Sequence, residues 1–204
     1  MKIFRRLYDW VLSWAESPYG PLALFILAFA EASFFPVPPD ALLIALCLGA
    51  LAKSFRFALN CAAASVLGAI FGYLIGQFAW WSNGAEFSGL AQFFFAHIPG
   101  FTETLFYSIQ DKYNEWNFWI IFTAGFTPIP YKVFTITAGA FDINFPLFLI
   151  ASIISRSARF FLVAGLIWKF GESIREFIDR YFNLVVIVFT ILLVGGFVLI
   201  KYLV

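Results

Sequence analysis

The sequence is poor in charged residues, which excludes an ordinary soluble domain. Charged residues make up only 12% of its 204 positions, whereas a typical soluble domain has about 25%. Hydrophobic residues make up 62%, and mean hydropathy is +0.88. A soluble fold of this size could not bury so much apolar surface. The composition therefore predicts an integral membrane protein, built from helices.

Histidine and cysteine are also scarce. His97 is the one histidine, and the two cysteines, Cys47 and Cys61, lie in apolar runs without a CxxC pair. A disulfide framework or a His/Cys metal site is not expected, and no cofactor is indicated. The formal net charge of +1 gives no indication of a nucleic-acid partner.

Two of the apolar runs are too short to cross a membrane because prolines break them. Residues 22–35 and 41–52 both fall below the ~20 residues that a crossing needs. Proline donates no amide hydrogen and restricts the residue before it, so a turn is expected rather than a bend. Residues 22–52 are therefore predicted to form a re-entrant helical hairpin, and residues 116–141 a second one. The predicted breaks lie at Pro36, Pro38, Pro39, Pro128 and Pro130.

The remaining segments predict helices that span or lie on the membrane. Residues 55–81 and 145–168 are long and apolar enough to be transmembrane helices. Residues 1–17 have apolar side chains on one helical face and predict an amphipathic helix on the membrane surface. Residues 82–116 are likewise expected on the surface, and residues 171–204 predict a connector followed by a final transmembrane helix.

A stripe of small residues lies on the predicted helix 55–81. Gly68, Gly72 and Gly76 recur at four-residue spacing. Such a stripe allows another backbone to approach closely. The partner is either another part of the chain or a second subunit of a homo-oligomer.

The two broken segments are related by an internal repeat. An offset of 92 residues matches Pro36 with Pro128 and Asp40 with Lys132. A single crossing separates the two hairpins, so they are expected to enter from opposite faces as an inverted repeat. The positive-inside rule then favours a cytoplasmic N-terminus. The cations on that side are Lys2, Arg5, Arg6, Lys53, Arg56, Lys169, Arg175 and Arg180.

Five charged residues lie within or beside the hydrophobic segments. A charge near the bilayer centre costs roughly 2.5–3.5 kcal/mol on insertion scales, so Arg156 and Arg159 need counter-ions. Glu31 and Asp40 are the expected partners, because an inverted repeat brings the hairpin tips together. With Lys132, these four residues form the candidate substrate and proton pathway. The alternative is an ion-pair network that only stabilises the fold.

The charges of this pathway suit two kinds of ligand. Burial raises the pKa of a carboxyl group and a nearby arginine lowers it, so such a group can titrate near neutral pH. Glu31 or Asp40 is therefore a candidate for proton coupling. Arginine binds phosphate through two parallel hydrogen bonds, so a lipid phosphate is a candidate ligand of Lys132, Arg156 and Arg159.

The order of these motifs resembles a known family. The segments are Glu31…Phe35-Pro36-Val37-Pro38-Pro39-Asp40, Gly68…Gly72-Tyr73…Gly76 and Phe126-Thr127-Pro128-Ile129-Pro130…Ala138-Gly139. Over residues 20–170 they resemble the DedA family of SNARE-associated, or VTT-domain, membrane proteins, and most of all its YqaA-like branch. The resemblance implies two opposed re-entrant hairpins and lipid transport by a flippase or scramblase. It also implies proton dependence and residence in a prokaryotic plasma (inner) membrane.

One part of the pattern differs. Many members of that family carry two arginines that flank the proline of the second hairpin. The matching positions here are Gly125 and Tyr131. Lys132 or the pair Arg156 and Arg159 is expected to supply the missing charge.

The leading prediction is a transporter, not an enzyme, that moves lipid or polyprenyl phosphate across the bilayer. The first alternative is a membrane polyprenyl-diphosphate phosphatase. A single histidine argues against the histidine-dependent type, and no helix carries a carboxylate cluster to hold a metal. The second alternative is a non-transporting envelope-stress or assembly factor.

Overall fold

A computed structural model describes residues 17–35, 37–82, 86–97, 102–127, 129–171 and 173, which are mostly helical. Pro36 and Pro128 lie outside these residues. So do nearly all of the predicted surface helix 1–17 and of the predicted C-terminal segment 171–204.

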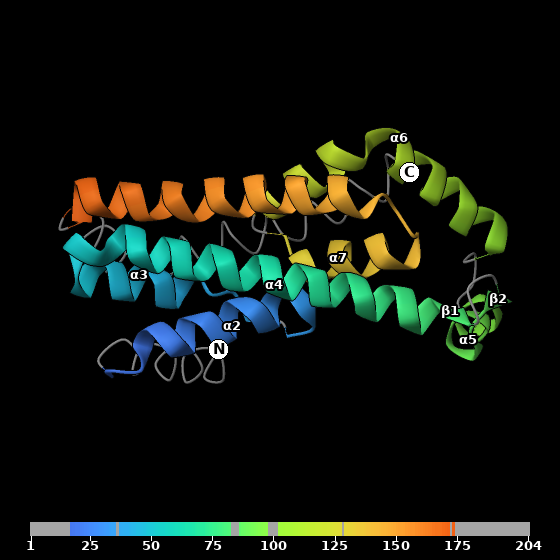
Figure 1. Cartoon of the computed structure of the whole chain (residues 1–204), viewed down its shortest axis with the longest axis horizontal. Coiled ribbons are helices and arrows are strands. Elements are labelled where there is room, and N and C mark those ends of the chain that lie inside the picture. The colour runs from blue at the N-terminus through green and yellow to red at the C-terminus, as the bar shows by residue number, and fades with distance from the viewer. Residues whose placement is uncertain are drawn as a thin grey trace.

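The first predicted hairpin is present as two antiparallel helices. Helix α2 (Gly20–Ser33) runs to the middle of the molecule, and α3 (Asp40–Gly49) runs back to the same end (Figure 1). Pro21 is tolerated in the first turn of α2, where its missing amide hydrogen has no helical acceptor. Helix α2 ends where the amides of Phe34 and Phe35 both donate to the carbonyl of Ala30.

Helix α4 (Ser54–Trp80) follows a short 3-10 turn, η1 (Leu51–Lys53), and runs most of the length of the molecule. Its glycines leave no room for a β-carbon. Gly68 lies against the carbonyl of Phe29 in α2, and Gly76 lies against the carbonyl of Ile136. Gly72 contacts Thr135 and the carbonyl of Ala32. The glycine stripe therefore packs against other helices of the same chain, which is one of the two partners that the sequence allows.

The region predicted as a surface segment, residues 82–116, is more structured than expected. Strands β1 (Trp81–Ser82) and β2 (Glu86–Phe87) pair antiparallel and are followed by α5 (Gly89–His97). Helix α6 (Glu103–Phe126) then continues through the predicted boundary at residue 116. Trp116 departs from helical geometry there (φ −109°, ψ 15°), so the predicted boundary is a kink rather than a helix start.

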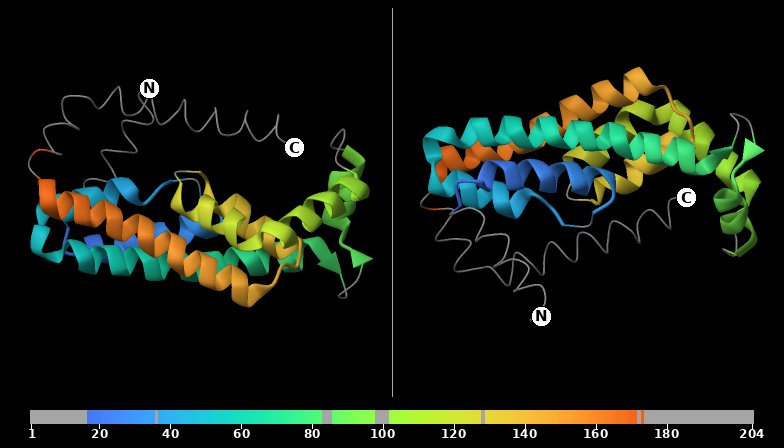
Figure 2. Two further views of the ribbon diagram at one scale, coloured as in Figure 1. Left: turned by 90° about the horizontal axis from the view of Figure 1, so that it is seen from above. Right: turned by 60° about the horizontal axis from the view of Figure 1, so that its bottom comes forward.

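The second hairpin consists of the end of α6 and helix α7 (Tyr131–Ala140). These arms meet in the middle of the molecule and open toward the end opposite to that of α2 and α3 (Figures 1 and 2). The helix Phe145–Gly171, orange in Figure 1, then returns along α4. The second arms, α3 and α7, both have 10 residues, and the long helices that follow them both have 27.

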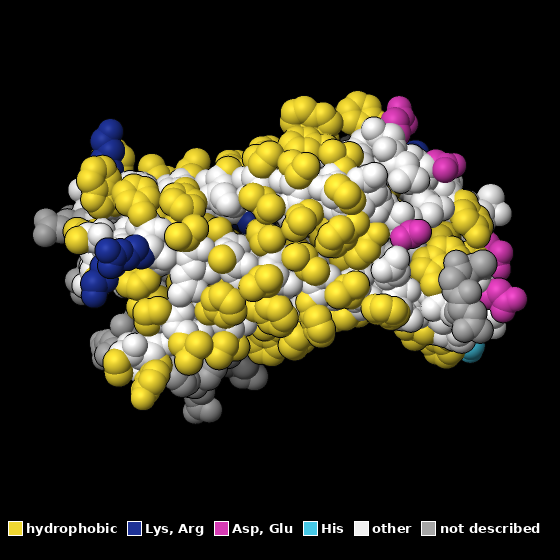
Figure 3. Space-filling model, viewed as in Figure 1, with side chains coloured by type: hydrophobic (Ala, Val, Ile, Leu, Met, Phe, Trp, Pro, Cys, Tyr) yellow, Lys and Arg dark blue, Asp and Glu magenta, His cyan; other side chains and the backbone are white. Residues whose placement is uncertain are grey.

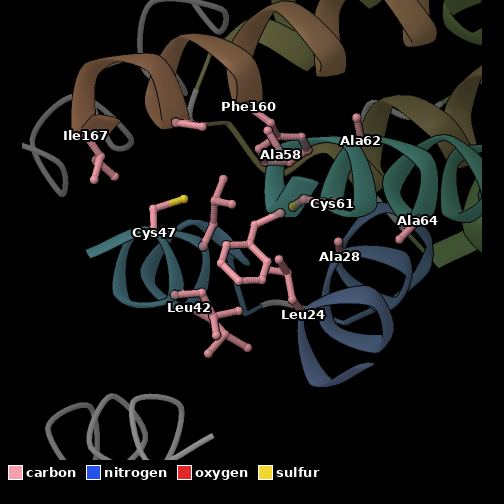
Figure 4. Packing of buried hydrophobic residues seen from close by; sticks show 14 residues of the cluster. Leu24, Ala28, Leu42, Cys47, Ala58, Cys61, Ala62, Ala64, Phe160 and Ile167 are labelled. Atoms are coloured by element: carbon pink, nitrogen blue, oxygen red, sulfur yellow. The ribbon is translucent and has the colours of Figure 1, made fainter. Parts of the chain in front are cut away.

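Two apolar clusters form the core, one in each half of the molecule. The first joins α2, α3, α4 and the helix Phe145–Gly171 around Leu24, Leu42 and Phe160 (Figure 4). The second surrounds Tyr73, Phe106 and Phe148 in the other half. The hairpin tips therefore meet between two packed regions.

Among the described residues, two helical segments, Leu51–Trp80 and Phe145–Gly171, are long and apolar enough to cross a membrane. They match the predicted helices 55–81 and 145–168 within four residues at either end. A helix of 27 residues is about 40 Å long, and the hydrocarbon core of a bilayer is ~30 Å thick. Apolar side chains are spread over the whole length of the visible face, and most of its charged side chains lie toward the two ends (Figure 3).

The close contact between α4 and α7 makes a stability prediction. In a Gly76→Ala variant the new methyl group would meet backbone atoms of Ile136 and Ala140, which cannot rotate away. We expect a loss of about 1–3 kcal/mol, measured as earlier thermal unfolding in detergent. The control is Gly165→Ala, where no atom lies within 4 Å of the added carbon. Equal unfolding temperatures of the two variants would contradict this packing.

Candidate functional site

The candidate site is a polar cluster halfway along the helix Phe145–Gly171. Arg156 and Arg159 are the twelfth and fifteenth of its 27 residues, so its midpoint lies between them. Their three-residue spacing places both guanidinium groups on one helical face. That face is directed at the hairpin tips, because both arginines bond to residues there.

Arg156 forms the deeper of two ion pairs. Its Nη2 donates to Oε2 of Glu31 at 2.6 Å, and its Nε donates to Oγ of Ser65 in α4 at 2.6 Å. Aromatic rings complete the surroundings, with the guanidinium carbon 4.9 Å from the ring centre of Tyr131 and 4.7 Å from that of Phe160. Arg156 is 1% exposed. This charge is thus compensated by one carboxylate, one hydroxyl and two aromatic faces.

Tyr131 joins the second hairpin to the same ion pair. It is the first residue of α7, and its backbone amide donates to Oε1 of Glu31 at 3.4 Å. Its phenol donates to Oγ of Ser152 at 2.7 Å, and that hydroxyl donates to the carbonyl of Phe148. Glu31 therefore contacts α7 through an amide and the helix Phe145–Gly171 through Arg156.

Arg159 forms the second ion pair and connects the tips of the two hairpins. Its Nε and Nη2 donate to the two carboxylate oxygens of Asp40, at 3.2 and 2.8 Å. Its Nη1 donates to the carbonyl of Thr127, directly after α6. One guanidinium group thus holds the start of α3 and the end of α6 together.

The two pairs differ in their exposure to the surroundings. The side chains of Arg156 and Glu31 are 2% and 10% exposed, whereas those of Arg159 and Asp40 are 13% and 21% exposed. The first pair is enclosed by core residues, and the second can be reached from outside. Glu31 and Asp40 are the counter-ions that the sequence predicts, and the structure assigns each to one arginine.

Lys132 lies beside the cluster but forms no ion pair with its carboxylates. Its Nζ donates to the carbonyl of Phe34 at 3.5 Å. Among the described residues, the ion pairs are those of Arg156 and Arg159, and Lys132 takes part in neither. Thr135, one turn further along α7, donates to the carbonyl of Ala32 at 2.8 Å. Side chains of α7 therefore bind the carbonyls at the C-terminal end of α2.

Of the prolines predicted to break the hairpins, the three that the structure describes lie at the turns. Pro39 directly precedes α3 and Pro130 directly precedes α7, while Pro38 is exposed in the first turn. Each second arm thus begins immediately after a proline. Asp40 is consequently the first residue of α3, where a carboxylate interacts favourably with the helix dipole.

Sequence reasoning missed the neutral members of the cluster, which are Ser65, Tyr131, Thr135 and Ser152. All four are buried polar side chains on helices with apolar surroundings. The available signal was a hydroxyl group on the same face as a glycine or an arginine. Ser65 is three residues before Gly68, and Ser152 is four before Arg156.

No group of three His, Cys, Asp or Glu side chains that could hold a metal ion occurs within the described part of the chain. The cluster instead offers two guanidinium groups, each neutralised by one carboxylate. If a carboxylate separates from its arginine, the arginine can bind an anion instead, and the carboxylate can accept a proton.

The difference in burial predicts unequal stability losses. Glu31→Gln would leave Arg156 without its counter-ion in the core, so we expect a loss of about 3–5 kcal/mol. The double variant Glu31→Gln/Arg156→Met should recover part of this loss, because no unpaired charge remains. Asp40→Asn is the matched change at the more exposed pair and should cost less. Chemical unfolding in detergent measures all three, and equal losses at the two pairs would contradict the assignment.

Sequence comparisons find two similar proteins. One is an uncharacterized protein of Haemophilus influenzae, 37% identical over 185 residues that cover 88% of this chain and 90% of that protein. The other is an uncharacterized protein of Histophilus somni, 36% identical over 188 residues that cover 88% and 91%. No protein-family model and no solved structure matches.

Proposed function

The chain belongs to the same family as the Haemophilus influenzae and Histophilus somni proteins, and we propose that it moves a lipid phosphate across a membrane. Its exterior and dimensions support a membrane location. Large apolar side chains are exposed along α2, α4 and the helix Phe145–Gly171. A water-soluble protein rarely exposes a continuous apolar surface of this extent.

The distribution of charge supports an orientation with the N-terminus in the cytoplasm. The described exposed charges at the end where α3 and α4 meet are the cations Lys53, Arg56 and Lys169. The other end carries mainly acids. These acids are Glu86, Glu103, Asp111, Glu115 and Asp142, with Lys112 among them. Cytoplasmic segments carry the excess of cations, so the cationic end would face the cytoplasm of a prokaryotic cell.

The two hairpins support an inverted repeat of the DedA type. Each hairpin has an arm that reaches the middle of the molecule, a turn that contains proline, and a second arm of 10 residues. A helix of 27 residues follows each hairpin. The hairpins open toward opposite ends (Figure 1). Transporters of this design bind substrate where the broken helices meet, near the bilayer midplane.

The main observation behind this proposal is that Arg156 and Arg159 both pair with carboxylates of the other half of the molecule. Arg156 and Arg159 follow the second hairpin, whereas Glu31 and Asp40 belong to the first. Exchange of these pairs would let the halves move against each other, as alternating access requires.

Proton coupling would use the same carboxylates. When Asp40 accepts a proton, Arg159 loses its counter-ion and becomes available to an anionic headgroup, whereas a proton on Glu31 would release Arg156 from the first hairpin. Proton entry and lipid binding would thus be linked through one ion pair, and each would favour the other.

Translocation in proteoliposomes tests this function. Purified protein, reconstituted with fluorescent lipids that carry phosphate monoester, diester or zwitterionic headgroups, should move at least one of them between leaflets. Arg159→Ala and Asp40→Asn should each lower the rate at least tenfold, since the site would lose one partner. Lys112→Ala, an exposed cation on α6, is the matched control and should retain the wild-type rate.

Two outcomes would contradict the proposal. Equal rates in wild type, Arg159→Ala and Asp40→Asn would show that the ion pairs are not part of a transport site. Release of phosphate from a lipid diphosphate without lipid movement would favour a phosphatase instead. A proton gradient should change the rate in wild type, and the same response in Glu31→Gln and Asp40→Asn would exclude coupling through these residues.

A further inference from the structure

We infer that Asp40 is a built-in competitor of the substrate: a phosphate headgroup displaces its carboxylate from Arg159, while the pair Arg156–Glu31 stays closed. This inference rests on the proposed function, because it assigns the headgroup to one of the two ion pairs. It gives Asp40 the role of setting how tightly an anion binds.

The geometry of the Arg159 pair suits such an exchange. Nε and Nη2 of Arg159 donate to two oxygens of one carboxylate. A phosphate group presents two oxygens to the same pair of donors, which is why arginine binds both groups bidentately. The phosphate could therefore take the place of the carboxylate without a change in the position of the guanidinium group.

A second contact would keep Arg159 in place during the exchange. Its Nη1 donates to the carbonyl of Thr127, which is a backbone atom and does not depend on Asp40. The guanidinium group would thus stay fixed at the tip of the second hairpin after Asp40 leaves. Asp40 lies at the start of α3, two residues after the exposed turn residue Pro38, and its side chain is 21% exposed.

The Arg156 pair is unsuited to the same exchange. Its guanidinium group lies between the rings of Tyr131 and Phe160, and Nε is held by Ser65. A headgroup could reach it only by separating α2, α4 and α7, which pack around the pair. Arg156 and Glu31 would therefore hold the halves together while the outer pair exchanges.

Binding to the purified full-length protein in detergent tests the inference without any transport step. The probes are dioctanoyl phosphatidate, dioctanoyl phosphatidylcholine and inorganic phosphate, measured by isothermal titration calorimetry. Asp40→Asn should bind dioctanoyl phosphatidate about tenfold more tightly than wild type, because the competing charge is gone. Arg159→Ala should lose this binding. Asp111→Asn, which removes an exposed carboxylate of α6, should bind as wild type does.

The probes also separate the two sources of the phosphate group. Tighter binding of phosphatidate alone supports the inference with a lipid as ligand, and the same gain for inorganic phosphate supports it with a free anion as ligand. A gain for phosphatidylcholine as large as that for phosphatidate would overturn it, because loss of the competing negative charge should favour the anionic phosphate monoester over a headgroup without net charge.

Unchanged or weaker phosphatidate binding by Asp40→Asn would overturn the inference. If Asp40→Asn does not fold, Asp40→Ser replaces it, since serine also suits the start of a helix. Failure of both variants to fold would mean that Asp40 is structural, which equally overturns the inference. Tighter binding by Asp40→Asn together with no translocation by wild type would contradict the proposed function alone.

Discussion

The structure depends on the cost of placing the Arg156 guanidinium group inside an apolar molecule. Such a charge costs several kcal/mol to desolvate, and it is tolerated only where its surroundings supply a counter-ion and hydrogen-bond acceptors. Here α2 supplies Glu31, α4 supplies Ser65 and α7 supplies the ring of Tyr131. The requirement of one side chain thus fixes three helices against the helix Phe145–Gly171. It also explains why both hairpins stop in the middle of the molecule, where their tips can reach this group.

Small residues on α4 make that meeting possible. Gly68 and Gly72 admit the end of α2, and Gly76 admits α7, with backbone atoms in direct contact. A larger side chain at any of these positions would move a hairpin away from the arginines. Close backbone packing and charge compensation therefore depend on each other. The outer pair Arg159–Asp40 adds a link between the hairpin tips that is less enclosed, and this difference is the basis of the functional proposals.

Much of this arrangement could be predicted from the sequence, because prolines, charges and glycines stand out in an apolar chain. Prolines gave the hairpin turns, and the cost of buried charge gave Glu31 and Asp40 as counter-ions. The individual pairings could not be predicted, since Arg156 and Arg159 share a face and only the helix positions assign each to a carboxylate. Ser65 and Tyr131 could not be predicted as members of the cluster. A neutral polar side chain costs less to bury than a charge, so the sequence does not show that it needs a partner. The sequence predicts the start of the second hairpin at Trp116, where the structure has a kink inside α6, because a change in polarity marks a helix start and a kink alike.

If the two hairpins enter a membrane from opposite sides and meet at the two ion pairs, the segments that flank them are accessible from opposite sides. Side-specific labelling tests it most directly. In a background of Cys47→Ala and Cys61→Ala, single cysteines would replace Lys53, beside the first hairpin, and Asp111, before the second. Both positions are exposed: Lys53 directly precedes α4, and Asp111 lies in the first half of α6. The account predicts that an impermeant maleimide labels Lys53→Cys only from the cytoplasmic side and Asp111→Cys only from the other side. Labelling of both from the same side would contradict it.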